Sequence, residues 1–110
     1  MIEEIVLNYL NHKMDVDVRM EEEKIKEEYI LIEKTGGGEE NHVKKAVIAI
    51  QSFADSLYRA AKLNEEVKKA MKSIVELKDI SKCDLNTDYN YTDIAKKKYR
   101  YQAVFDITYY

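Results

Sequence analysis

The chain ends in the stretch YRYQAVFDITYY, residues 99–110, and this stretch decides the class of fold. Every second position carries an apolar or aromatic side chain: Tyr99, Tyr101, Ala103, Phe105, Ile107 and Tyr109. The positions between them are mostly polar. A two-residue period places the two sets on opposite faces of a β-strand. Residues 99–110 therefore predict a half-buried strand.

Four segments upstream also have the composition of strands. Residues 14–20 alternate apolar and polar side chains, and residues 29–33 form a short apolar run rich in β-forming residues. Residues 43–50 begin polar and become apolar on both faces, which is typical of a strand inside a sheet. A further strand is predicted over residues 79–87. Residues 88–98 are expected to form a polar loop with a basic end.

The only three glycines, Gly36, Gly37 and Gly38, follow the apolar run at residues 29–33. Because glycine tolerates positive φ, this run predicts the turn of a β-hairpin. A phosphate-binding loop is the alternative interpretation. Such a loop leads into a helix, and the adjacent Glu39 and Glu40 would repel the anion. The hairpin is therefore favoured.

Two segments have the apolar spacing of amphipathic helices. Residues 2–11 predict a short N-terminal helix, and a long helix is predicted from about Asp55 to about Leu77. In the first half of the long helix, Leu57, Tyr58 and Ala61 form a second apolar set beside the main stripe. This set can pack on the N-terminal helix or on another subunit, and the spacing does not choose between them.

These segments predict a single domain over residues 1–110, of the α+β class. Strands do not alternate with crossover helices, and the connections are short, which favours an antiparallel or mixed sheet. We therefore expect a mostly antiparallel sheet of four or five strands. The short N-terminal helix and the one long helix are expected to pack on it.

The composition is that of an ordinary globular domain, with 45% hydrophobic and 35% charged residues. No apolar run approaches the roughly 18 residues of a membrane helix, so no membrane partner is expected. The first residues lack the basic region of a secretory signal. The single cysteine, Cys83, favours a reducing compartment and a core or strand position.

The net charge of −3 hides an asymmetry along the chain. Residues 1–40 carry 12 acidic and 5 basic side chains, a net −7, whereas residues 41–110 carry 9 acidic and 13 basic, a net +4. Opposite charges can attract neighbouring copies in a head-to-tail contact, although chance accounts for the asymmetry equally well. The positive charge is too dispersed to indicate nucleic-acid binding.

No residue pattern typical of catalysis or of metal binding occurs in the sequence. The serines and Cys83 lie in no nucleophile motif, and neither His12 nor His42 has a partner at metal-ligand spacing. The neighbouring Glu21, Glu22 and Glu23 are interpreted as solvated carboxylates rather than as a metal site. We therefore expect a protein that is not an enzyme and that requires no cofactor.

Six of the nine tyrosines lie between Tyr89 and Tyr110, interleaved with basic residues. Aromatic residues beside basic ones are enriched in protein interfaces, and they also bind single-stranded nucleic acid. A strand face covered by a helix accounts for Tyr99 and Tyr101. From these patterns we predict a subunit or partner interface that contains Leu57, Tyr58, Tyr89, Tyr91, Lys96, Lys97, Lys98 and Arg100.

Three segments resemble the small tail-terminator proteins, also described as tail-completion or minor capsid proteins, of long-tailed bacteriophages. Residues 28–37 (EYILIEKTGG) are similar to that family's strand before a Gly-Gly turn. Residues 49–67 are similar to its passage from a strand through Ile-Gln-Ser into a long helix, and residues 100–105 (RYQAVF) to its closing strand. Prolines that often precede the first segment in the family are missing here, so the path of residues 20–28 is not predicted.

The resemblance implies a structural virion protein that oligomerises into a ring, expected to be a hexamer, which caps the tail tube and joins it to the head. Its partners would be other copies of itself, the tail-tube protein and head–tail connector proteins. It would be located in the tail or neck of a virion assembled in the bacterial host cytoplasm. The alternatives are a head–tail connector or neck adaptor protein and, from a different class, a small nucleic-acid-binding regulator that uses the Lys96–Arg100 region.

Overall fold

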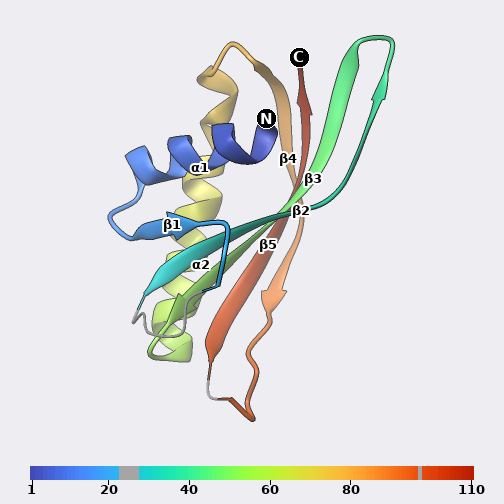
Figure 1. Ribbon diagram of the computed structural model, residues 1–110. Helices are drawn as coiled ribbons and strands as arrows, with labels where there is room; N and C mark the ends of the chain where they lie inside the picture. The colour runs from blue at the N-terminus through green and yellow to red at the C-terminus, as the bar shows by residue number, and fades with distance from the viewer. Residues whose placement is uncertain (23–27, 97) are drawn as a thin grey trace.

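The computed structural model describes residues 1–22, 28–96 and 98–110. Five strands form one sheet in the order β1-β2-β3-β5-β4, and α1 and α2 cover one of its faces (Figure 1). The elements are α1 (Ile2–Lys13), β1 (Asp17–Arg19), β2 (Tyr29–Glu40), β3 (Val43–Ala54), α2 (Leu57–Lys72), the 3-10 helix η1 (Ile74–Glu76), β4 (Ile80–Asn90) and β5 (Tyr99–Tyr109).

The predicted α+β class and the mostly antiparallel, mixed sheet are confirmed. β2 and β3, β3 and β5, and β4 and β5 pair antiparallel, whereas β1 and β2 pair parallel. The parallel pair is short, because β1 contains only Asp17–Arg19 rather than the predicted residues 14–20.

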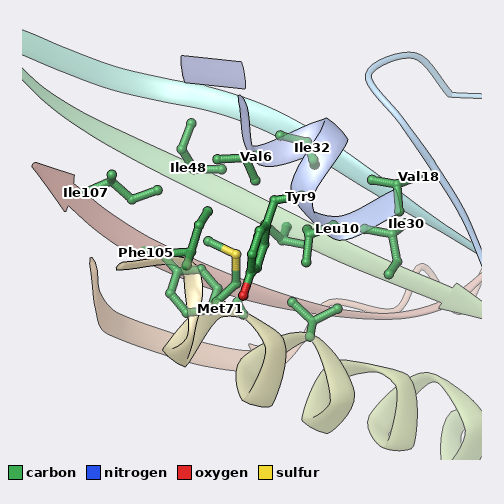
Figure 2. Packing of buried hydrophobic residues seen from close by; sticks show 14 of the residues in the cluster. Val6, Tyr9, Leu10, Val18, Ile30, Ile32, Ile48, Met71, Phe105 and Ile107 are labelled. Carbon is green, nitrogen blue, oxygen red and sulfur yellow. The ribbon is translucent and has the colours of Figure 1, made fainter. Parts of the chain in front are cut away.

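One hydrophobic core lies between the sheet and the helices (Figure 2). The buried residues of α1 recur at helical spacing, and those of α2 form one stripe that includes Leu63, Val67 and Met71. They meet the alternate side chains of the strands that point toward the helices. These strand residues include Ile30, Ile32, Ile48, Ile50, Ala103, Phe105 and Ile107.

The long helix is shorter at both ends than predicted. The Ser56 hydroxyl accepts a hydrogen bond from the Arg59 N–H at 3.1 Å, which caps the helix so that it begins at Leu57. It ends at Lys72, and the chain then tightens into η1, where the N–H of Glu76 donates to the carbonyl of Ser73 at 3.0 Å. This change of pitch keeps Ile74 in the core.

The predicted hairpin is present, but the predicted position of its turn is wrong. Gly36, Gly37 and Gly38 lie inside β2, and none of them has a positive φ. The turn lies instead at Asn41 and His42, whose φ angles are 52° and 67°. A two-residue loop with positive φ at both positions is the type I′ turn, whose twist matches that of the flanking strands.

Of the three glycines, Gly37 occupies the position where a side chain would meet the closest neighbouring atoms. A Cβ atom at this position would lie 2.8 Å from the carbonyl oxygen of Lys45 and 2.9 Å from Cε of Lys34. The β2–β3 register shifts just before it, between Lys34 and Gly36. Such a bulge bends the strand, and the bend brings the two backbones closer than a side chain would allow.

β3 and β5 are the longest uninterrupted pair in the sheet. Their pairing runs from Lys44 and Tyr109 to Ala54 and Tyr99 without a register shift. This pairing extends β3 beyond the predicted end at residue 50. β4 likewise continues to Asn90, so residues 88–90, which were expected in a loop, belong to a strand.

The molecule is elongated, with principal extents of 45 × 24 × 21 Å. At one end, the distal part of the β2–β3 hairpin extends beyond the helices (Figure 1). We call residues 33–46 the arm. At the other end, the beginning of β5 lies near the beginning of α2, because Ala54 pairs with Tyr99 and α2 begins three residues after Ala54 (Figure 1).

Candidate interaction surface

The second apolar set of the long helix is exposed in the isolated chain. Leu57 is 41% exposed and Tyr58 is 71% exposed, while Ala61 is half-buried. The Nζ atom of Lys62 lies 5.8 Å from the centre of the Tyr58 ring, one turn along the helix. Leu57 and Tyr58 therefore do not pack on α1, which was one of the two alternatives for this set.

Three other predicted interface residues form a cluster on the sheet face opposite the helices. The Arg100 guanidinium carbon lies 4.4 Å from the centre of the Tyr91 ring and 5.5 Å from that of Phe53. Tyr89 and Tyr91 contact each other edge to face, with ring centroids 5.7 Å apart. Cation–π and edge-to-face contacts both follow from the charge distribution of aromatic rings.

The lysines at residues 96–98 contribute differently to this end of the molecule. Lys96 is exposed, and its backbone N–H donates to the Asp93 carboxylate at 3.3 Å. Lys98 forms an ion pair with Glu22, which raises the pKa of Lys98 and lowers the pKa of Glu22. Lys97 lies outside the described residues.

Several residues of the uncovered sheet face were not predicted from the sequence. The rings of Tyr29 and Phe53 stack with centroids 4.5 Å apart and planes 7° apart. Burial, followed by the charge of Glu22, raises the pKa of Tyr29. The Tyr29 phenol is therefore neutral at physiological pH. The Phe53 ring of this stack is the apolar surface that the Arg100 guanidinium contacts.

A pair of glutamines crosses the centre of the same face. The amide Nε2 of Gln51 donates to Oε1 of Gln102 at 2.9 Å, and Nε2 of Gln102 donates to the Tyr89 hydroxyl. Both glutamines are buried. Direct pairing of β3 with β5, and of β5 with β4, places the three side chains in one row. Because these buried amides are hydrogen-bonded to each other and to Tyr89, they fix the relative positions of the three side chains.

Five predicted residues therefore gather at one end of the molecule, which we call the aromatic end: Leu57, Tyr58, Tyr89, Tyr91 and Arg100. Leu57 and Tyr58 project from the beginning of α2, and the other three lie on the uncovered face of the sheet. Tyr89, in β4, is 40% exposed, and Tyr91, just after β4, is 43% exposed. Large, rigid aromatic side chains beside an arginine are the composition of interface hot spots.

The arm offers a second surface, at the opposite end. The residues from Glu33 to His42 are exposed, except for the half-buried Gly36. A shallow groove of about 900 Å³ lies between the arm and the adjoining strands, with Lys45, Val47, Asp84 and Asp106 in its lining. Asp84 and Asp106 pair directly across β4 and β5. The Lys82 ammonium lies 3.4 Å from the Asp84 carboxylate, and Nδ2 of Asn86 donates a hydrogen bond to the Asp106 carboxylate at 3.0 Å.

Cys83 occupies a half-buried strand position in β4, as expected. Burial raises the pKa of its thiol to about 12, and Asp84 and Asp106 add to this effect. Because the thiolate is the reactive form, this thiol is not activated for nucleophilic chemistry.

In the described part of the chain, no three His, Cys, Asp or Glu side chains converge in a way that could hold a metal ion. Of the three neighbouring glutamates considered as a metal site, Glu21 and Glu22 are exposed, and Glu23 lies outside the described residues. None of the described helices combines the length and the apolar character needed to cross a membrane.

Comparison with known proteins adds no functional assignment. No protein-family model and no curated protein matches this sequence.

Proposed function

We propose that the protein is a non-enzymatic structural subunit that assembles with copies of itself into a ring at the end of a bacteriophage tail tube. The observation that carries self-assembly is the exposure of Leu57 and Tyr58 together with Tyr89 and Tyr91 at the aromatic end. These residues lie on both sides of the sheet at the same end of the molecule, and exposed apolar and aromatic residues are typical of protein–protein contacts.

The assignment to a phage tail is supported by the resemblance of three segments to tail-terminator proteins. These segments form β2, the passage from β3 into α2, and β5, which are adjacent elements in the fold. An elongated subunit with a distinct surface at each end also suits a ring that meets different partners above and below. The tail-tube protein and a head–tail connector protein are the proposed partners.

Nucleic-acid binding through the Lys96–Arg100 region is less well supported by the local contacts. Lys98 forms an ion pair with Glu22, and the Arg100 guanidinium contacts the rings of Tyr91 and Phe53. Both cations would have to leave these partners to contact phosphates.

The proposal is tested by size-exclusion chromatography with light scattering and by negative-stain electron microscopy of the purified protein. Annular particles are expected, alone or after addition of purified tail tubes. The variants L57D and Y58D should lose the assembly while keeping the circular dichroism spectrum of the wild type. V75D is the matched control, because Val75 is 47% exposed but lies in η1 at the other end of the helical segment.

A protein that stays monomeric at every concentration, and that binds no tail tubes, would contradict the proposal. Salt-sensitive binding to duplex DNA by such a monomer would instead favour the regulator. Loss of helical structure in Y58D would place Tyr58 among the residues that stabilise the fold rather than among those of an interface.

A further inference from the structure

We propose that neighbouring copies join strand to strand, with the outer edge of the arm in β2 pairing antiparallel with the outer edge of β4 in the next copy. This inference rests on the proposed self-assembly and identifies one contact through which it would occur. The occupant of each edge is thus a second copy of this chain.

Both edges are free over a long stretch in the described residues. β1 pairs with β2 only at Tyr29, Ile30 and Leu31, so the outer edge of β2 from Ile32 to Glu40 has no neighbouring strand within those residues. β4 is the last strand at the other side of the sheet and pairs only with β5 there. An unpaired strand edge presents backbone N–H and C=O groups that another strand can satisfy.

The directions of the two edges are compatible. Three antiparallel pairings lead from β2 through β3 and β5 to β4, so β2 and β4 run in opposite directions. A copy rotated about an axis roughly parallel to the strands brings its β4 beside β2 as another antiparallel neighbour. Since two different edges meet, the contact is head to tail, and such contacts close into a ring when the rotation allows.

One register between the two edges matches opposite charges at two places. When Glu40 lies opposite Lys82 of the next copy, Lys34 lies opposite Asp88, because both pairs are six positions apart along their strands. Lys34 and Asp88 are on the side of the sheet that bears the helices: Lys34 pairs with the core residue Ile48, and Asp88 contacts Lys68 of α2. Glu40 and Lys82 are on the opposite side.

The bulge of β2 also coincides in this register with one of the two irregularities of β4, while the other, between Ile80 and Lys82, lies at the end of the proposed pairing. β2 has its register shift between Lys34 and Gly36, and β4 has one between Leu85 and Thr87. The two bulges then overlap, with Thr35 opposite Thr87 and Gly36 opposite Asn86 of the next copy. Side-chain alternation stays in step on both sides of them, so opposite charges meet on the same face at both pairs.

The exposed leucine of β4 provides an apolar contribution to the same contact. Leu85 is 45% exposed and lines a groove of about 470 Å³ between β4 and α2, beside the buried Met71 and Phe105. In the proposed register Leu85 faces Gly37 of the next copy. The Lys34 side chain passes over Gly37 on this face, so Leu85 would contact its aliphatic part.

Cross-linking tests the pairing directly. In a C83S background, E40C and K82C introduce cysteines at exposed positions that the register places opposite each other. Treatment of E40C/K82C with a mild oxidant or a short bis-maleimide should give a ladder of covalent multimers on a denaturing gel. Each single-cysteine variant should remain at the monomer position. Dimers from E40C alone would overturn the proposal in favour of arm-to-arm contacts.

Charge reversal supplies a second, independent readout. E40K and K82E each place like charges opposite each other in the contact, so the association constant from light scattering should fall about three- to tenfold. The double variant E40K/K82E restores opposite charges and should recover the wild-type constant. Equal loss in the double variant would overturn the proposed register.

The two proposals fail in distinguishable ways. A wild-type protein that forms rings, while E40C/K82C gives no ladder, overturns the strand pairing and leaves the proposed function standing. A wild-type protein that never associates, with or without tail tubes, overturns both. If L57D abolishes the rings while E40K and K82E have no effect on them, the contact lies at the aromatic end and the strand pairing is overturned.

Discussion

The guanidinium carbon of Arg100 lies 4.4 Å from the centre of the Tyr91 ring, and Nε of the same side chain donates to the Tyr91 carbonyl at 2.6 Å. One side chain thus fixes both the ring and the backbone at the point where β4 ends. The same guanidinium also contacts the ring of Phe53.

Replacement of Arg100 should measure what this arrangement contributes. We expect R100A to lower the free energy of unfolding by about 2–4 kcal/mol, the sum of a cation–π contact and a charge-assisted hydrogen bond. R100K should recover little of it, since an ammonium group cannot stack as a planar guanidinium does. Urea denaturation followed by circular dichroism measures both. K96A, at an exposed neighbour, should change stability by less than about 0.5 kcal/mol; equal effects of K96A and R100A would contradict the expectation.

The Gln51–Gln102 pair should behave non-additively. Q102L removes the acceptor of the Gln51 Nε2 group and the donor to the Tyr89 hydroxyl, at a cost of about 1–3 kcal/mol. Q51L should cost a similar amount. In Q51L/Q102L neither amide of the pair remains, so the double variant should be more stable than the sum of the single effects predicts. A double-mutant cycle by urea denaturation checks this, and strict additivity would show that the amides do not depend on each other.

Replacement of His42 by glycine should stabilise the turn of the arm. His42 has a φ of 67°, which costs any residue with a Cβ atom, and glycine is preferred at the second position of a type I′ turn. H42G should raise the free energy of unfolding by about 0.5 kcal/mol. H42V should lower it by about 1–2 kcal/mol, because a β-branched residue tolerates positive φ least. Thermal unfolding of the two variants in parallel tests the prediction, which fails if they shift the midpoint in the same direction.

The thiol of Cys83 should make stability fall in alkaline solution. Its folded pKa of about 12 lies above that of an unfolded thiol, about 8.5. The unfolded state therefore loses a proton first, and stability that is complete below pH 8.5 decreases as the pH rises toward 12. C83S should show a flatter dependence in this window. Urea denaturation at several pH values measures it, and identical slopes for the two proteins would contradict the raised pKa.

Much of the fold could be predicted because its signals are local. The alternation in residues 99–110 and the 3.6-residue stripe of α2 each depend on neighbours within one element, and both elements are confirmed. The predicted position of the hairpin turn is wrong, because glycine tolerates positive φ but a turn with positive φ does not require glycine. In the structure Asn41 and His42 adopt it, while backbone pairing with β3 holds the glycines in extended conformation.

The aromatic end was predicted only in part, for a different physical reason. Tyr89, Tyr91 and Arg100 could be selected from their local composition. Their partners Phe53 and Gln51 lie in another strand, and the Gln51–Gln102 bond joins residues 51 positions apart. Which side chains meet across strands depends on the register, and the register is decided by the packing of the whole sheet. No local pattern in the sequence carries that information.

The uninterrupted pairing of β3 with β5 has a consequence for spacing. A slip of one residue between these strands would move Phe105 and Ile107 out of the core and Gln102 into it, so the pair has a single register. β5 extends from the aromatic end to the arm, and the ten steps between its 11 residues span about 33 Å at roughly 3.3 Å each. The single register of β3 and β5 therefore fixes the distance between the two ends of the subunit. Partners bound at the aromatic end and at the arm would be held at that distance from each other.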